Sequence, residues 1–536
     1  MKLKHTTLFI VLAGLFFSSC KEEKTVYENP YDGGKEPLGI VTNPQQIPVP
    51  EFGPAGTEVT IAATGLLKHK DKLGFQFNGQ DAQIISVTDA GIVVKVPGKA
   101  SSGITAFVID GQLVFGPTFT VTGKVNIDPT FVTTIGTNGT VVKAVPLDGG
   151  NLMLLGSFTN YDNKGVVKRI NRITRIFPDG TWDRSLLTGE GANGTINSMT
   201  RLNGFFYIAG GFGGYAQQGG INRIAKISTS GVLDTMEVKT YLQKSRYISK
   251  FNGGVDGNIN NVYAFNGKII ATGNFSYYLR RRFDMPTVKY LDSTITDSTD
   301  VRQLARFDEN GKLDSTWRFD KNAVGYRGTL GKSLPGGNGS LNSLMHEDGK
   351  ILCFGQFTTF DNTNVGRIVR LNPDGSIDQT FNVGGTGADD WIYNLTYDQA
   401  SNKYIVVGRF RTFNGKLSTH IVKLNYDGTV DASFAPKEFT AGQPQYAKIL
   451  SDGLIVVSGD FRTYDTVIRN GFLIMNPDGT LADGYNTIGN VNGSSQKFFD
   501  VYETKSADGK RALLIMGSFY SFDNKPRNNI VRVTLE

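Results

Sequence analysis

The sequence has little of what most catalytic and metal sites need. Its 536 residues include only two cysteines and four scattered histidines, and none of these has the spacing of a zinc site. It has no Ser-His-Asp elbow, phosphate-binding loop or dinucleotide fingerprint. We therefore expect no cofactor and no metal. A carboxylate-based hydrolysis would have to use acids outside the repeats described below: Asp284, Asp292, Asp389 and Asp390.

The chain also lacks a concentrated positive charge. Its formal net charge is +7, to which Lys2 and Lys4 contribute, and Arg280-Arg281-Arg282 is the only tight basic cluster. A nucleic-acid-binding protein is expected to carry a basic stripe, and here no basic stripe is interleaved with aromatic residues. We expect no nucleic-acid partner.

The N-terminus has the pattern of a secretory signal. A basic start is followed by an apolar run from Leu8 to Phe17, which is too short to span a bilayer as a mature helix. The run ends in Ser18-Ser19-Cys20. A plain signal peptide with a chance cysteine is the alternative to a lipid-attachment site.

Small residues directly before a cysteine resemble a bacterial lipobox. The resemblance implies that residues 1–19 are a lipoprotein signal peptide, that Cys20 carries the lipid, and that residues 20–35 form a flexible tether. The following Lys21-Glu22-Glu23 resembles the acidic surface-export signal of lipoproteins in Bacteroidota. The implied location is the outer membrane, with the protein facing the cell exterior and touching the membrane only through its lipid.

Residues 36–123 are dense in strand signals. Apolar and polar residues alternate, and strands recur every few residues with turns between them, which predicts a β-sandwich. The phrases 54–61, 77–82 and 92–97 resemble an IPT/TIG immunoglobulin-like domain. Such domains most often act as spacers, so this segment carries no functional prediction of its own.

One short phrase, Gly-x-Phe after an apolar run, occurs seven times in residues 124–536. Repeats of this length that are rich in strands and tight turns predict an all-β propeller. In the clearest unit, 340–381, four strands are separated by Asp-Gly turns, and this phrasing resembles the delta-60 family of propeller repeats. The seven anchors are Gly156/Phe158, Gly210/Phe212, Gly273/Phe275, Gly355/Phe357, Gly408/Phe410, Gly459/Phe461 and Gly517/Phe519.

The two ends of the repeat region complement each other. The seventh unit ends without its fourth strand, and the missing phrase stands before the first unit, at Asn126–Phe131. A strand at about 125–131 is therefore predicted to complete the last of seven blades, which would leave no free sheet edge.

The longest connections, 237–257, 276–302 and 318–338, are predicted to be irregular loops on one face. Long loops on a rigid scaffold often bind ligands, although neutral drift in loop length is the alternative. Exposed aromatic residues can stack on sugars, but the same residue types also form protein–protein contacts. The candidate ligand-binding residues are Tyr241, Tyr247, Tyr277, Tyr278, Arg280, Arg281, Tyr326, Asp389, Asp390 and Trp391.

Other recurring residues are predicted to be structural. Turn acids and amides are expected to cap the backbone rather than form a ring of cation ligands: Asp162, Asp361, Asn414, Asp465 and Asp523. Basic residues of the third strands are expected to pair with the closing aspartates: Arg172, Lys226, Arg306, Arg370 and Lys423. Trp182 and Trp317 are expected to pack between blades, and Cys353 to be buried.

The order of lipobox, TIG-like spacer and propeller resembles accessory surface lipoproteins of SusC/SusD-type TonB-dependent importers. The resemblance implies a non-catalytic protein that captures a nutrient, usually a glycan, for an outer-membrane transporter. A scaffold of the importer with no small ligand and an enzyme that cleaves a polysaccharide or peptide are the alternatives.

Overall fold

The computed structural model describes residues 37–536, except 168, 240–241, 243 and 284–294. Cys20 and the predicted signal peptide and tether lie outside the described residues. The described part contains no α-helix and three short 3-10 helices: η1 (Leu67–His69), η2 (Asp148–Gly150) and η4 (Tyr326–Gly328). None of its helices is long and apolar enough to cross a membrane. Residues 42–536 form one compact unit.

Two sheets fold from the first 80 or so residues of this unit. Side chains on β3 alternate, so that Val59 and Ile61 are buried between exposed neighbours, as the sequence predicted. Phe75 and Phe107 meet edge to face at 5.1 Å within the same core. One sheet contains β3 (Glu58–Thr64), β7 (Gly91–Lys95) and β6 (Gln83–Thr88); the other has the order β2 (Phe52–Gly53), β9 (Gln112–Val121), β8 (Gly103–Ile109), β4 (Gly74–Phe77), β5 (Gln80–Asp81).

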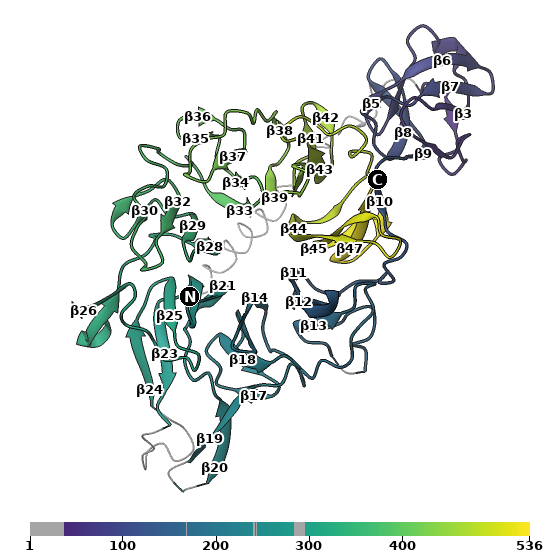
Figure 1. Ribbon diagram of the computed structural model, residues 1–536. Coiled ribbons are helices and arrows are strands. Elements are labelled where there is room, and N and C mark those ends of the chain that lie inside the picture. The colour runs from purple at the N-terminus through teal and green to yellow at the C-terminus, as the bar shows by residue number, and fades with distance from the viewer. Residues whose placement is uncertain (1–36, 168, 240–241, 243, 284–294) are drawn as a thin grey trace, which may run out of the picture. The chain divides into compact units, whose positions relative to one another are not determined.

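Seven antiparallel sheets follow, named sheets 1 to 7 in chain order (Figure 1). Sheet 1 contains β11 (Val141–Pro146), β12 (Leu152–Gly156) and β13 (Ile173–Ile176), and sheet 2 contains β14 (Ile196–Leu202), β15 (Phe205–Gly210) and β18 (Ile224–Ser228). Sheet 3 contains β21 (Asn258–Phe265), β22 (Lys268–Asn274) and β25 (Leu304–Phe307), sheet 4 contains β28 (Leu341–Met345), β29 (Ile351–Gly355) and β32 (Ile368–Leu371), and sheet 5 contains β33 (Ile392–Asp398), β34 (Lys403–Gly408) and β37 (Ile421–Asn425). Sheet 6 contains β39 (Pro444–Ile449), β40 (Ile455–Gly459) and β43 (Phe472–Met475), and sheet 7 contains β44 (Asn492–Lys505), β45 (Arg511–Phe522) and β47 (Ile530–Leu535).

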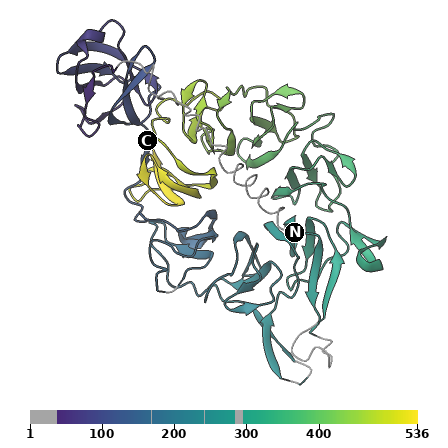
Figure 2. The same ribbon diagram turned by 180° about the vertical axis from the view of Figure 1, so that it is seen from behind.

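The hydrophobic core lies between neighbouring sheets. Seven clusters of buried residues each combine side chains of two consecutive sheets, and one of them joins sheet 7 to sheet 1 through Leu514 and Leu154. Contacts between the sheets run in the same cyclic order. The first strand of each sheet lies on the side nearest a common centre (Figure 1), and Figure 2 shows the same sheets from behind. Apolar burial between sheets therefore holds the sheets in a closed order.

The two ends of this region meet in sheet 7. Strand β10 (Val125–Ile127) pairs antiparallel with β47, with Val125 opposite Leu535. Just beyond β10, the buried Asp128 accepts a hydrogen bond from Arg532 Nε at 2.5 Å. The pairing agrees with the closing strand predicted near residue 126, although β10 ends at Ile127.

The predicted fourth strand of the other sheets is reduced to a single bridge. In sheet 4, Leu371 pairs with Ile377 and the chain then turns away. In this sheet the chain turns at the closing aspartate, where Asp378 Oδ1 accepts both the amide and the hydroxyl of Thr380. The backbone amide of Thr380 is thus bonded within the turn, whereas in a longer strand it would pair across the sheet.

The predicted basic–acidic pairs form in four sheets: Lys226–Asp234, Arg306–Asp314, Arg370–Asp378 and Lys423–Asp431. In sheet 1 the prediction was wrong, because Arg175 and not Arg172 pairs with Asp183, at 2.6 Å. Arg172 precedes the strand, has a φ of +70° and donates to Phe158 O. The seam pair Arg532–Asp128 repeats the same arrangement with residues from the two ends of the region.

The turn residues adopt left-handed φ values of +45° to +51°, which Asp and Asn tolerate better than most residues: Asp162, Asp361, Asn414, Asp465 and Asp523. Four of the side chains accept a backbone amide 25–34 residues away in the chain, so these caps are not local to the turn: Asp162, Asp361, Asn414 and Asp523. Asp361 also pairs with Arg318. Trp317 is buried and donates to Pro373 O of the next sheet, and Trp182 packs against the cluster between sheets 1 and 7. Cys353 is buried on β29, where burial raises the pKa of its thiol to about 12.

The three long connections are hairpins, so the prediction of irregular loops was wrong. β19 (Thr235–Lys239) pairs with β20 (Ser245–Ser249). The hairpins β23 (Tyr277–Arg281)–β24 (Thr296–Asp300) and β26 (Phe319–Val324)–β27 (Leu330–Ser333) join into one sheet through a parallel pair between β24 and β27. Shorter pieces are β16 (Gly214–Tyr215), β17 (Gln218–Gly219), β30 (Thr359–Phe360), β31 (Thr363–Asn364), β35 (Thr412–Phe413), β36 (Lys416–Leu417), β38 (Phe439–Thr440), β41 (Thr463–Tyr464), β42 (Val467–Ile468) and β46 (Lys525–Pro526).

Candidate ligand-binding cavity

A polar cavity of about 540 Å³ lies where the first strands of the seven sheets converge. Its lining includes residues of β11, β14, β21, β28, β33, β39 and β44. A cavity of this size falls in the range of small-molecule sites. We call it the central cavity.

β-Bulges in the first strands contribute five residues to its wall. In β14, Ile196 pairs with Gly210 and Ser198 with Ala209, so Asn197 is an extra residue. A bulge re-aims a side chain that would otherwise follow the pleat. The extra residues that line the central cavity are Val142, Asn197, Asn260, Tyr393 and Phe499, and Gln445 is a sixth bulged residue outside the lining.

The anchor glycines allow a close approach to the backbone of the first strands. A Cβ added to Gly210 would lie 2.2 Å from Thr195 O, and one on Gly408 would lie 2.1 Å from Trp391 O. The same holds at all seven anchors, where the closest backbone oxygen lies 1.8–2.3 Å from the added Cβ. The phenylalanines of the phrase are at most 5% exposed. Gly-x-Phe therefore combines a close strand approach at the cavity wall with an anchor in the core.

Side-chain amides dominate the lining: Asn197, Asn258, Asn260, Asn261, Asn342, Asn394 and Gln496. Several of them are linked across the first strands. Asn197 Nδ2 donates to Asn258 Oδ1 at 3.1 Å, and Asn261 Nδ2 donates to Asn342 Oδ1 at 2.6 Å. These bonds fix the orientation of the amides, so their remaining donors and acceptors are held in place before a ligand arrives.

Asn394 is the exception in this network. Its Oδ1 is buried and has no hydrogen-bond partner among the described residues, although the residue lines the central cavity. A buried acceptor without a partner costs about 1–3 kcal/mol. A donor from a ligand or from water in the cavity would remove that cost.

The charged residues of the lining are Lys143, Lys448 and Asp500. Lys448 Nζ already donates to Val501 O at 2.5 Å, and Asp500 Oδ2 accepts from the amide of Ala144 at 3.4 Å. Burial, with the charge of Asp500, raises the pKa of Tyr446 well above its usual value, so its hydroxyl stays protonated. Among the described lining residues, the cavity thus has one carboxylate and a mainly neutral polar surface.

The predicted segment 389–391 lies beside the cavity. Asp389 Oδ1 accepts from the amides of Arg411 and Thr412, so it holds a turn. Asp390 pairs with Arg409 at 3.2 Å, and the guanidinium of Arg409 lies 5.6 Å from the ring centre of the 37% exposed Trp391.

Tyr393 connects this group to the central cavity. It lines the cavity, and its hydroxyl accepts from Gln443 Nε2 at 2.8 Å. Burial raises the pKa of that hydroxyl, and the charges of Arg409 and Asp390 also act on it. The group around Trp391 therefore lies close to the tyrosine in the cavity wall.

The candidates in the hairpin insertions do not line the central cavity. Tyr278 is buried and donates to Gly311 O at 3.0 Å, and burial raises its pKa to about 12. Tyr247 is 63% exposed on β20. Tyr277, Arg280 and Arg281 lie half-buried on β23. Tyr241, Asp284, Asp292 and the side chain of Tyr326 lie outside what the structure describes.

Sequence reasoning missed the amides of the central cavity. A signal was present, because asparagine is depleted in strands, yet it follows an apolar residue at the start of three predicted strands: Ile196-Asn197, Ile259-Asn260 and Leu341-Asn342. Within the described residues, no group of three or more His, Cys, Asp or Glu side chains could hold a metal ion.

Two family models match parts of the chain. A domain of unknown function, DUF5008, matches residues 16–117. A β-propeller domain of unknown function, DUF5122, matches residues 346–381, 399–434 and 450–481, which fall in sheets 4, 5 and 6. No curated protein matches the sequence.

Several solved structures are similar to parts of the chain. The WD40 β-propeller domain of Doa1 is 14% identical with a TM-score of 0.40, over 77% of this chain and 96% of that one. An auxiliary nutrient binding protein from Bacteroides thetaiotaomicron is 11% identical with a TM-score of 0.32, over 92% and 98%. Another from Bacteroides ovatus is 12% identical with a TM-score of 0.28, over 92% and 98%. The DUF5122 matches on three consecutive sheets identify this part of the all-β chain as a β-propeller.

Proposed function

We propose that the protein is a non-catalytic binding protein whose central cavity takes a neutral, hydroxyl-rich nutrient, a glycan. The observation that carries the proposal is the amide lining with the unsatisfied acceptor Asn394 Oδ1. An amide can both donate to and accept from a sugar hydroxyl, and Tyr393 and Phe499 offer rings for its apolar face. Two of the three charged lining residues, Lys448 and Asp500, already bind the backbone, so the lining offers more neutral than charged partners.

The proposal includes a finer description of the fold. We interpret the seven sheets as seven blades, with β10 completing the last one. Residues 36–123 are interpreted as an immunoglobulin-like sandwich of the TIG type that acts as a spacer. Seven blades would place seven first strands around the cavity, in agreement with its lining.

A non-catalytic role is supported by the interactions that the carboxylates near the cavity already make. Glycoside hydrolysis generally uses two carboxyl groups placed on either side of the bond that breaks. Asp389 caps a turn, and Asp390 is paired with Arg409. Release of products from a panel of polysaccharides and peptides would overturn this part of the proposal in favour of an enzyme.

We place the protein on the outer membrane, anchored through Cys20 and facing the exterior, where it delivers the glycan to a SusC/SusD-type importer. The support is the lipobox and the order of the segments in the sequence. Cys20→Ala is expected to release the protein from the membrane fraction. Co-purification of a TonB-dependent transporter with the wild type tests the partner.

The binding test compares variants of the central cavity with variants elsewhere. Wild type is titrated with oligosaccharides chosen from a glycan array. Asn394→Leu and Tyr393→Ala are each expected to weaken binding about tenfold or more, because each removes a polar or stacking contact. Asn372→Ala is the matched control, since this asparagine bonds Ser376 in an exposed turn. Unchanged affinity in both cavity variants would contradict the proposed site.

A scaffold without a small ligand is the second candidate. Exposed apolar side chains on the hairpin insertions favour it, because such residues can form protein contacts: Tyr247, Val324 and Leu330. Co-purification with a transporter, no glycan binding, and loss of the transporter in Tyr247→Ala would support the scaffold over the glycan binder.

A further inference from the structure

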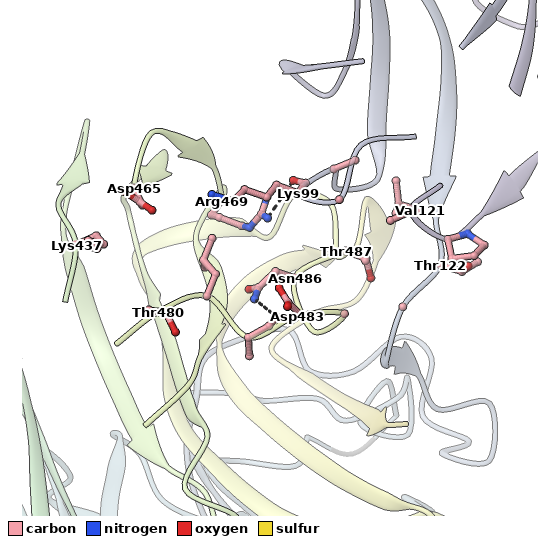
Figure 3. A pocket seen from close by; sticks show the side chains of 18 residues that line it. Lys99, Val121, Thr122, Lys437, Asp465, Arg469, Thr480, Asp483, Asn486 and Thr487 are labelled. Carbon is pink, nitrogen blue, oxygen red and sulfur yellow. Dashed lines mark hydrogen bonds between the residues drawn. The ribbon is translucent and has the colours of Figure 1, made fainter. Parts of the chain in front are cut away.

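A second pocket, of about 420 Å³, lies between the N-terminal sheets and sheet 6 (Figure 3). One wall comes from 98–100 and 121–123, and the other from 480–487 together with Arg469. The walls are fixed to each other, because the amide of Ser102 donates to Thr487 O at 2.9 Å. The pocket is therefore part of a hydrogen-bonded junction.

Arg469 is the unusual residue of this pocket. It is only 5% exposed, yet it forms no ion pair with any described residue. Its Nη1 donates to Ile468 O at 2.6 Å and its Nη2 to Lys99 O at 3.1 Å, while its buried Nε has no hydrogen-bond partner. Burial lowers the pKa of the guanidinium to about 10, so it remains a cation at neutral pH.

The other buried arginines show what is missing at Arg469. Arg318, Arg370 and Arg532 are buried to a similar degree, and each is bonded to an aspartate at 2.5–2.8 Å. A buried charge without a counter-charge is costly. Arg469 is thus the one buried arginine of the described residues that lacks a carboxylate.

The other charged groups of the pocket do not supply the counter-charge. Lys99 and Lys437 add two exposed positive charges at the rim, and Asp465 and Asp483 add two exposed carboxylates. Neither carboxylate is within ion-pair distance of Arg469 in the structure. Figure 3 shows Arg469 reaching toward Lys99, with Asp465 and Lys437 on its other side.

The lining amide is already occupied. Asn486 Oδ1 accepts from the amide of Ile474, and its Nδ2 donates to the carbonyls of Ile474 and Ala482. Arg469 therefore provides the free buried donor in this part of the pocket, and that donor is cationic.

We propose that this pocket binds a small oxyanion, a carboxylate or a phosphate or sulfate group, with Arg469 as its charge partner. Guanidinium groups suit such anions because their N–H donors match the oxygens in geometry and charge. Lys99 and Lys437 at the rim attract the anion and add to its binding. The site is independent of the central cavity, and the anion contacts segments of both the N-terminal sheets and sheet 6.

The experiment is a calorimetric titration of the full chain with inorganic phosphate and, separately, with glucuronate. Binding of both identifies a general oxyanion site, and binding of only one identifies the source of the anion. Arg469→Gln is expected to weaken binding about tenfold or more, because it removes the buried charge. Arg462→Gln, an exposed arginine in the hairpin before Arg469, is the matched control and should bind as the wild type does.

A second variant separates anion binding from a structural role of Arg469. Asp465→Asn removes a nearby negative charge and keeps a residue that tolerates its φ of +50°, so it is expected to bind the anion several-fold more tightly. An arginine that only bridges to Lys99 O would give no anion binding in any variant. The proposal is overturned if neither anion binds the wild type, or if Asp465→Asn leaves the affinity unchanged.

Discussion

The first strands and the hairpin insertions of the propeller are built by opposite sequence features. The first strands belong to the most regular part of the chain, and they surround the central cavity. The insertions are its most irregular part, and they form hairpins with hydrogen bonds of their own outside that cavity. Departures from a repeat pattern had suggested the functional residues, but the first strands of the repeats provide the polar wall, in part through bulged residues such as Asn197 and Asn260.

The reason is convergence. One bulge on one strand re-aims one side chain, but bulges on strands arranged around a centre aim several side chains at the same space. An insertion extends a single connection between two strands, so equivalent side chains from other sheets do not join its side chains in one space. Variants of the two regions can test this difference.

Asp128→Asn should destabilise the protein by about 3–5 kcal/mol, because it leaves the buried Arg532 without its counter-charge and opens the closing pair. Asp297→Asn is the control in an insertion, where the partner Arg282 is 3.1 Å away and the carboxylate is 45% exposed. An exposed pair contributes about 0–1 kcal/mol. Urea unfolding measures both, and equal losses would contradict the contrast.

Gly273→Ala should destabilise the protein by about 1–3 kcal/mol or more, because the added Cβ would lie 2.3 Å from Asn258 O. It should also weaken glycan binding, since it displaces the bulge at Asn260. Gly219→Ala, where no atom lies within 4 Å of the added Cβ, is expected to change stability by less than about 1 kcal/mol. Thermal unfolding and titration of both variants provide the test.

Acid should destabilise the propeller through its closing aspartates. Burial alone would raise the pKa of Asp378, but hydrogen bonds from Thr380, Lys350 and Arg370 lower it overall. A pKa lowered in the folded state gives stability that is present above the unfolded value of about 3.9 and is lost as pH falls below it. Asp183, Asp314 and Asp431 also have lowered pKa values.

The acid effect can be assigned with one variant. The free energy of unfolding of Asp378→Asn should fall less steeply between about pH 5 and 2 than that of the wild type. This pH range lies around the unfolded pKa of about 3.9. Asp81→Asn in the N-terminal sheets is the exposed control. An unchanged slope in Asp378→Asn would show that this pair does not cause the acid loss.

Tyr247→Ala should have the smallest effect. Its side chain is 63% exposed on β20 and does not line the central cavity, so stability should change by about 0.5 kcal/mol or less. Glycan affinity should also stay unchanged. A large loss of glycan affinity in this variant would show that the binding site lies on the insertions.

Local patterns predicted the parts of the fold that depend on neighbouring residues. The Gly-x-Phe phrase, the turn at Asp361 and the pair Arg370–Asp378 are all read within one repeat. The choice of Arg172 over Arg175 failed because it misaligned the repeat. Arg172 holds the left-handed position before the strand that Arg367 holds in sheet 4, and Arg175 is the equivalent of the paired Arg370.

The candidate site was predicted only at its edge. Trp391 and Asp390 lie beside Tyr393, which belongs to the wall of the central cavity. Asn260, Asn342 and Asn394 were not predicted, because they are far apart in sequence and a single asparagine in a strand does not show which other residues share its space. Their relation appears only when the first strands are placed around one centre.

Local sequence patterns were enough to predict the repeat, the closing strand near residue 126 and the buried aromatic anchors. These features follow from turn chemistry, side-chain alternation and the special freedom of glycine, which act over a few residues. Tertiary contacts were needed to show that amides of different first strands converge on a cavity and that two of the long insertions pair into one sheet. They were also needed to show that Arg469 is buried without an acid, because convergence and burial depend on contacts between residues far apart in the chain.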